Sequence, residues 1–388
     1  DGRLDKPTSA SGMTYYRGDQ FPETNRQDVF VAEPAGNVVV QLRLLREGLD
    51  LSADHILYED EKWGQREFLA STDERFRPVD VDVGPDGALY VVDMYRGIIQ
   101  DQIFLSDELR AQALSRGLDE PIGMRRIWRI TATEGKSKAA PVRFSASGRK
   151  LLKLLRSNNG WVRDTTQRLL LVAKGRGIDN GLRRLAAGDN KNAALHAIWT
   201  LQGRGALDRR TLAKALDNNS PIIQIAAMRA GYKLLSTETL LNLATQSDHA
   251  LISHHATMYL ADNNDRKEVI EYLVSRLVKG DPGSLERTAI QAAGRENELT
   301  LINAISTLGW NQTKETSTNF IKDLISQSFR ASPQKGKLLL DYIMSEEQPW
   351  LQQTLLAGLF EVTRDKSFKR VVLDDEHRLF ANPPDDIW

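Results

Sequence analysis

The chain has 388 residues, and its 52 Lys and Arg balance its 52 Asp and Glu. A formal net charge of zero excludes a global field that would attract nucleic acid or an anionic membrane. No apolar run approaches the roughly 20 residues that span a bilayer, so no transmembrane segment is expected. The sequence contains no cysteine. This excludes disulfides, thiolate metal sites and a covalently attached c-type haem, which requires a C-x-x-C-H motif.

The first part of the chain is patterned as short strands. Residues 30–44 indicate two strands around a turn at 33–37, and 45–75 indicate a surface excursion between strands. The Tyr15–Tyr16 pair is expected to pack at a sheet edge rather than to contact a ligand.

Residues 77–99 contain the clearest hairpin. Val79, Val81 and Val83 alternate with acidic residues, which predicts a strand with one buried face. The sequence Gly-Pro-Asp-Gly at 84–87 predicts a tight turn, and 88–92 predicts the returning strand. A further strand is expected within 118–130. Such short antiparallel strands are typical of β-propeller blades, and we count about two blades, fewer than the roughly four to eight that close a ring.

One helix interrupts the strand pattern. Residues 105–116 have helical spacing, with Ser106 or Asp107 as N-cap and Gly117 as the stop. Such an insertion either lies over the ligand-binding end of a propeller or is a surface decoration.

Beyond a linker at 131–143, the apolar period changes from two to 3.6 residues. Helix pairs recur about every 30 residues, and Asn158, Asn190, Asn218 and Asp248 mark the turns. Such pairs bury their apolar stripes by stacking, which predicts a HEAT-like α-solenoid. The fold class is therefore terminal β-propeller blades followed by an α-solenoid. The predicted domains are blades at 1–143, helical repeats at 144–370 and an extended tail at 371–388. Two apolar stripes, at 148–156 and 161–172, come first, and further helices are expected over about 178–187, 191–203, 208–217, 221–235, 238–246, 249–262, 265–279, 284–294, 298–309, 314–329, 335–345 and 348–363.

Four segments carry a specific resemblance: GMTYYRGDQFP from Gly12, VFVAEPAGNVV from Val29, FRPVDVDVGPDGALYVVDMYRGIIQ from Phe76 and PIGMRRIWRI from Pro121. They occur in the same order in the planctomycete and Bacteroidetes family of membrane-bound dehydrogenases, which this chain resembles over about residues 8–235. The resemblance implies a propeller similar to soluble pyrroloquinoline-quinone sugar dehydrogenases, then HEAT-like repeats and often a c-type cytochrome domain. It also implies a periplasmic or cell-surface location.

The same resemblance implies a cofactor site. In the quinoprotein dehydrogenases two arginines and a lysine hold the quinone carboxylates. Arg77 matches the first arginine, whereas the second falls on Val79 and the lysine falls near Ala35. Arg75 is a substitute one turn away. The catalytic histidine and the calcium ligands of that class would lie outside this chain, so no catalytic residue and no metal ligand is assigned.

Three residues at the end of the predicted strand 88–92 complete the candidate site. Asp93 and Arg96 are placed to make polar contacts with a sugar or quinone, and Tyr95 to stack on it. The alternative is an Asp93–Arg96 pair that fixes the blade end. Arg125, Arg126 and Arg129 surround Trp128 and are expected to pair with acids on neighbouring strands.

The helical part offers fewer candidates. His196 is expected to be a core residue, and the spacing of His249, His254 and His255 does not suit a metal pair. Asp164 is expected to have a cationic partner such as Arg168.

Two functions follow. The first is an extracytoplasmic oxidoreductase that uses pyrroloquinoline quinone and calcium and passes electrons from a sugar or aldehyde to a haem domain outside this chain. The second is a non-catalytic scaffold that binds polysaccharide or partner proteins through the blades and the solenoid. Expected partners are other domains or subunits, a c-type cytochrome or carbohydrate, and not nucleic acid.

Overall fold

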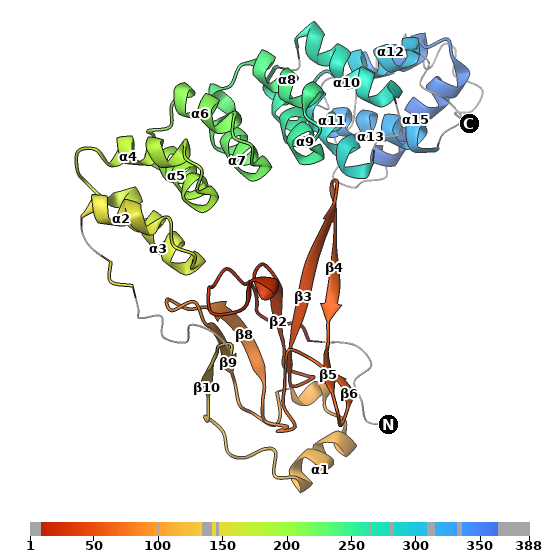
Figure 1. The fold of residues 1–388 in the computed structure, drawn as a ribbon. Helices are drawn as coiled ribbons and strands as arrows, with labels where there is room; N and C mark the ends of the chain where they lie inside the picture. The colour runs from red at the N-terminus through yellow and green to blue at the C-terminus, as the bar shows by residue number, and fades with distance from the viewer. Residues whose placement is uncertain are drawn as a thin grey trace. The chain divides into compact units, whose positions relative to one another are not determined.

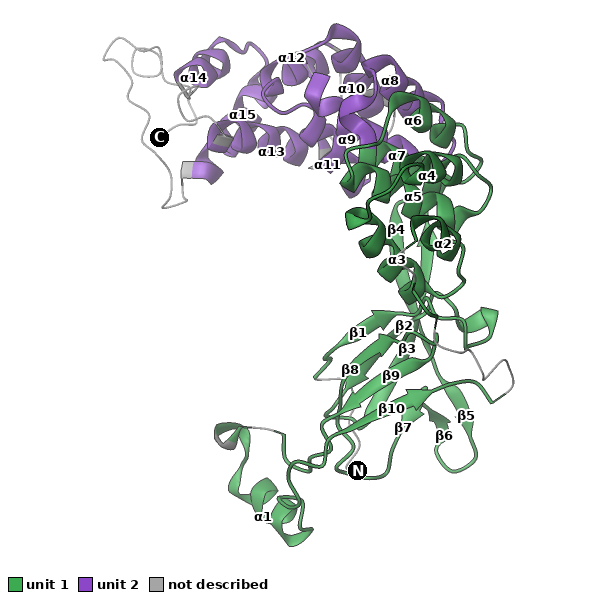
Figure 2. Ribbon diagram, turned by 90° about the vertical axis from the view of Figure 1, so that its left-hand side faces the viewer, with its two compact units in different colours: residues 1–230 green, residues 231–388 purple. Residues whose placement is uncertain are grey.

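The computed structural model describes residues 9–99, 101–133, 142–144, 147–263, 265–279, 283–308, 315–331 and 336–363. In these residues an antiparallel sheet region is followed by helices (Figure 1). The chain divides into two compact units, residues 1–230 and 231–388 (Figure 2). The predicted tail at 371–388 and most of the predicted linker at 131–143 lie outside the described residues, and the predicted domain boundaries stay predictions.

The strands of unit 1 form three antiparallel sheets. The largest has the order β1–β2–β3–β4, with β7 also paired to β3, and the next has the order β10–β9–β8. The third pairs β5 with β6. The bounds are Met13–Tyr15 for β1, Val29–Glu33 for β2, Val38–Glu47 for β3, Asp50–Ile56 for β4, Tyr58–Asp60 for β5, Gly64–Arg66 for β6, Leu69–Ala70 for β7, Pro78–Val83 for β8, Leu89–Asp93 for β9 and Arg126–Ile130 for β10.

The long hairpin of β3 and β4 corrects one prediction. The sequence predicts a surface excursion over residues 45–75, but β3 continues to Glu47 and pairs with β4 from Gln41 onward. The outer half of β3 and nearly all of β4 are exposed, so neither face is consistently apolar. A strand that is held only by backbone hydrogen bonds needs no buried face. Its sequence therefore does not alternate between apolar and polar residues.

The β8–β9 hairpin forms as its pattern predicts. Val81 and Val83 are buried, and Asp80 and Asp82, which alternate with them, are exposed. The valines join a core with Tyr16, Phe21 and Phe30, in which the Tyr16 and Phe21 rings stack with centroids 4.4 Å apart. Tyr16 is thus a packing residue, as expected. The helix inserted before β10, α1 (Asp107–Ser115), begins after the predicted N-cap Ser106, whose Oγ accepts a hydrogen bond from Leu109 N.

The helices of unit 1 pack in two layers. α2 packs against α3 and α4, α4 against α5 and α6, and α3 against α5. The predicted Asn190 caps α5, whereas α3 is capped by Asn159 rather than by the neighbouring Asn158. The bounds are Gly148–Leu154 for α2, Gly160–Val172 for α3, Ile178–Ala186 for α4, Lys191–Gly203 for α5, Arg209–Leu216 for α6 and Pro221–Gly231 for α7.

Helices are the only regular secondary structure among the described residues of unit 2. α8 packs against α9, α9 against α11, α10 against α12 and α13 against α15. The bounds are Tyr232–Leu234 for the short helix η3, Thr237–Gln246 for α8, Ala250–Tyr259 for α9, Leu260–Asn263 for the short helix η4, Lys267–Lys279 for α10, Ser284–Ala293 for α11, Glu298–Leu308 for α12, Glu315–Ala331 for α13, Gly336–Ser345 for α14 and Pro349–Thr363 for α15. The predicted helices from 178 onward are confirmed, with small differences at their ends. Among the described helices, none has both the length and the apolar character to cross a membrane.

Candidate functional site

The predicted site residues meet at one end of the β8–β9–β10 sheet. Arg77 immediately precedes β8, Asp93 ends β9, and the register places Asp93 opposite both Pro78 and Arg126. Tyr95 and Arg96 follow Asp93 in the loop that leaves β9. We call this end of the sheet the corner. All four predicted residues lie at the corner, and their binding of a cofactor stays a prediction.

The guanidinium of Arg77 is occupied by backbone carbonyls. Nη1 donates to Pro34 O at 2.7 Å, Nη2 to Gly97 O at 2.8 Å and Nε to Arg96 O at 3.1 Å. The residue is 9% exposed, and burial lowers its pKa because charge is less well solvated there. Arg77 therefore ties the turn between β2 and β3 to the loop after β9.

The Asp93 carboxylate is fully buried and accepts three N–H groups. Oδ1 accepts from the backbone N–H groups of Arg77 and Tyr95, each at 2.8 Å, and Oδ2 accepts from Trp128 Nε1 at 3.0 Å. The alternative in which Asp93 pairs with Arg96 is not found, since the ion pairs of the described residues do not include it. Asp93 does fix the strand end, but through the backbone and an indole.

Tyr95 has a cation against its ring. The Arg126 guanidinium lies 3.5 Å from the ring centroid, a cation–π distance, and 5.7 Å from the Trp128 ring. Tyr95 adopts a φ of 45°, a left-handed conformation that costs a non-glycine residue about 1–2 kcal/mol. Arg96 is exposed. A ligand at the corner would thus meet Arg96 and the exposed side of the Tyr95–Arg126 stack.

The predicted pairing of the β10 arginines holds for one of them. Arg129 donates to the Asp86 carboxylate at 2.6 Å, across to the turn between β8 and β9. Burial raises the pKa of Asp86, but its hydrogen bonds with Arg129 and Ala88 N outweigh this and leave the pKa below the usual range.

These residues do not fit the quinone that the resemblance implies. A ligand with three carboxylates needs cations with free N–H groups, and the Arg77 donors face carbonyl oxygens. Val79 and Ala35, at the other matched positions, carry no charge. Arg75 donates to the carbonyls of Gly117 and Glu120. Among the described residues no group of three His, Cys, Asp or Glu is placed to hold a metal ion.

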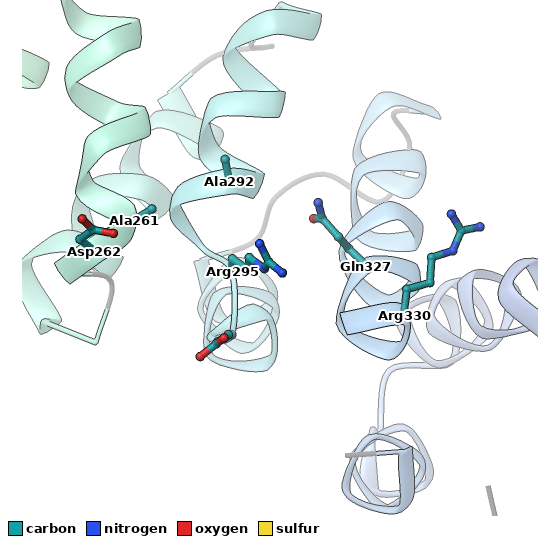
Figure 3. A pocket seen from close by; sticks show the side chains of 7 residues that line it. Ala261, Asp262, Ala292, Arg295, Gln327 and Arg330 are labelled. Atoms are coloured by element: carbon teal, nitrogen blue, oxygen red, sulfur yellow. The ribbon is translucent and has the colours of Figure 1, made fainter. Parts of the chain in front are cut away.

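A groove in unit 2 was not predicted. It has a volume of about 720 Å³, and its polar lining comes from η4, the turn that follows α11, and α13 (Figure 3). Asp262 stands on one side, Gln327 on the other, and Arg295 between them. The lining residues are Ala261, Asp262, Ala292, Arg295, Glu296, Gln327 and Arg330. They are widely separated in the sequence and share no motif, so only the fold brings them together.

His196 is a core residue, as expected. Its Nδ1 lies 2.7 Å from Gln167 Oε1, and its Nε2 accepts a hydrogen bond from Arg163 Nε at 3.3 Å. Burial, aided by the nearby Arg163 charge, lowers the pKa of His196 to about 4. Asp164 has a cationic partner, as expected, but the partner is Arg17 from the sheet region and not Arg168.

Residues 1–134, about a third of the chain, match a family model described as a domain of unknown function (DUF7133). The match contains the corner. No curated protein sequence matches the chain.

Proposed function

We propose that this chain belongs to a non-catalytic, extracytoplasmic scaffold in which terminal β-propeller blades are followed by a HEAT-like solenoid. The scaffold binds polysaccharide or partner proteins. One observation carries the choice over catalysis: the only cation at a matched cofactor position, Arg77, donates to the carbonyls of Pro34, Arg96 and Gly97.

The hydrogen bonds of the Arg77 guanidinium argue against a role for Arg77 in ligand binding. An arginine that holds a carboxylate presents two parallel N–H groups to it. At the corner, the N–H groups of Arg77 instead donate to the backbone of two loops. Turning them towards a ligand would leave buried carbonyls without donors, which would cost about 1–3 kcal/mol of folding free energy for each carbonyl. A cofactor that used Arg77 would therefore break the hydrogen bonds that hold the loops of its own site together.

The architecture supports a scaffold in two respects. The orders β1–β2–β3–β4 and β10–β9–β8 have the consecutive antiparallel pairing of propeller blades. The layered helices α2–α6 have the nearest-neighbour packing of a repeat array. Repeat arrays present extended surfaces for binding, and the groove of unit 2 is one such surface.

The test is a titration of the protein with pyrroloquinoline quinone and calcium, followed by dye reduction with a panel of sugars and aldehydes. We expect no saturable absorbance change and no dye reduction. Arg77→Lys should lower the thermal midpoint, because an ammonium cannot reach carbonyls on both loops. Quinone binding that disappears in Arg77→Lys would overturn the scaffold proposal.

A second candidate is the oxidoreductase, favoured by the order of the four segments within residues 12–130. In that case the solenoid would be a spacer or docking surface towards a haem domain. Dye reduction by the quinone-loaded protein would establish this candidate in place of the scaffold.

A further inference from the structure

A second groove, in unit 1, concentrates positive charge. It has a volume of about 400 Å³ and is formed by α4 and α6. Four cations and a single carboxylate line it, in a chain whose net charge is zero. We call it the basic groove, and its lining residues are Arg183, Arg184, Ala187, Asp208, Arg210, Thr211 and Lys214.

Its one acid is already neutralised. Asp208 Oδ2 accepts from Arg183 Nε at 2.7 Å, and Oδ1 caps α6 by accepting from Thr211 N at 2.8 Å. The bond from Thr211 is the largest cause of a lowered Asp208 pKa, so the carboxylate stays ionised and paired. Arg183 is held further by Ala206 O. The Arg183–Asp208 ion pair therefore stabilises the fold and is not free to bind a ligand.

The other three cations are not neutralised by an ion pair, although Arg184 Nε donates to Asn180 O at 3.3 Å. Arg184, Arg210 and Lys214 are exposed. None of them takes part in an ion pair of the described residues. α2, which packs against α4, adds exposed cations at 149, 150 and 153. Positive charge on a neutral protein is thus gathered on one group of neighbouring helices, where it attracts an anionic partner.

We infer that the basic groove binds an acidic segment of a partner polypeptide. This inference rests on the proposed scaffold function and names the class of partner. The lining contains no aromatic side chain on which nucleic acid bases or sugar rings would stack. The exposed large apolar residues of the described chain include none on α2, α4 or α6, so no side chain there would insert into a lipid surface.

The spacing of the cations also suits an extended chain. Arg210 and Lys214 are four residues apart on α6, a rise of about 6 Å. Alternate side chains on one face of an extended strand are about 6.6 Å apart. Acidic residues at every second position would therefore reach both cations, while the Arg184 guanidinium offers a bidentate contact from α4.

The experiment measures binding of fluorescein-labelled poly-L-glutamate to the full chain by anisotropy. We expect saturable binding that weakens with added salt, because the contacts lie at the surface. Arg184→Gln with Arg210→Gln and Lys214→Gln should reduce the affinity at least about tenfold. The control removes the same charge from exposed positions of unit 2, by Lys233→Gln, Arg266→Gln and Lys267→Gln, and should change the affinity less than about twofold.

Equal losses in both triple variants would mean a general charge effect and would overturn the inference. The inference would also be overturned if polygalacturonate or anionic lipid vesicles bound more tightly than poly-L-glutamate and if the triple variant of the basic groove abolished that binding. Dye reduction on the same preparation separates the two claims. Dye reduction together with poly-L-glutamate binding would refute the scaffold function but support the basic groove as a binding site. No dye reduction and no poly-L-glutamate binding would refute only the basic groove as a binding site.

Discussion

At the end of β9, three N–H groups point at one buried carboxylate. Asp93 accepts from Arg77 N, Tyr95 N and Trp128 Nε1, so both of its oxygens are used. Asp93→Asn replaces one oxygen with a donor that faces another donor. We expect a loss of about 2–4 kcal/mol in the free energy of unfolding, measured by urea denaturation, because charged hydrogen bonds are lost and a buried N–H is left unpaired.

A matched control is Asp54→Asn. It makes the same chemical change on exposed β4, and it should alter stability by less than about 0.5 kcal/mol. Equal small effects of both substitutions would contradict the role given to Asp93.

His196 makes a pH-dependent contribution between α3 and α5. Burial holds the pKa of His196 in the folded chain at about 4, below the usual histidine value of 6.5. Above about pH 6.5 the imidazole is neutral in both states. Below that pH the unfolded chain binds the proton first, so stability falls as the pH decreases towards 4. The loss approaches about 3 kcal/mol at pH 4.

The measurement compares the unfolding free energy of wild type and His196→Gln across this range. Carboxylates titrate in both proteins and cancel in the difference. The stability advantage of the wild type should shrink below pH 6.5, and a constant difference would refute a buried neutral imidazole.

At the scale of elements, the Gly-Pro-Asp-Gly turn between β8 and β9 is a packing centre. Tyr16 Oη donates to Gly87 O at 2.6 Å, and Gly87 has a φ of 80°. A Cβ on Gly87 would lie 2.0 Å from Asp19 Oδ1. We expect Gly87→Ala to cost more than the roughly 1–2 kcal/mol of left-handed strain alone.

Gly48→Ala isolates that strain. Gly48 has a φ of 59° in the β3–β4 turn, with nothing within 4 Å of an added Cβ. Thermal denaturation should therefore show a smaller loss for Gly48→Ala than for Gly87→Ala. If the losses were the same, the contacts around the turn would contribute nothing.

These elements also mark what sequence patterns can predict. The β8–β9 hairpin and the helices from 178 to 363 follow from apolar periods, since each buries one face. The β4 strand does not, because it is exposed on both faces and held by pairing with β3.

The corner was predictable in position but not in chemistry. Strand ends bring Arg77, Asp93, Tyr95 and Arg96 together, and strand patterns reveal strand ends. Their partners are the carbonyls of Pro34 and Gly97 and the indole of Trp128, which only the folded chain brings close. Every residue carries a backbone carbonyl, so the sequence does not show which carbonyls accept a side-chain hydrogen bond.

At the scale of unit 1, one junction joins the sheet region to the helices. Asn159 caps α3 and its Nδ2 donates to Pro85 O in the hairpin turn at 3.0 Å. Gly160 N donates to Arg17 O at 2.7 Å, beside the Arg17–Asp164 ion pair. The first full helix of the array is thus bonded directly to two segments of the sheet region.

This junction predicts that the sheets and the first helices open together. In hydrogen exchange, the amides of β2, β9 and α3 should share one opening free energy, as members of one cooperative unit do. Gly160→Val should separate them, because an added Cβ would lie 2.6 Å from Arg17 Cβ and push α3 away. Gly188→Ala, whose Cβ meets nothing closer than 3.4 Å, should leave exchange unchanged. Different opening energies in the wild type would mean that these bonds do not couple the sheets to the array, and a partner held by the helices would then have no mechanical link to the corner.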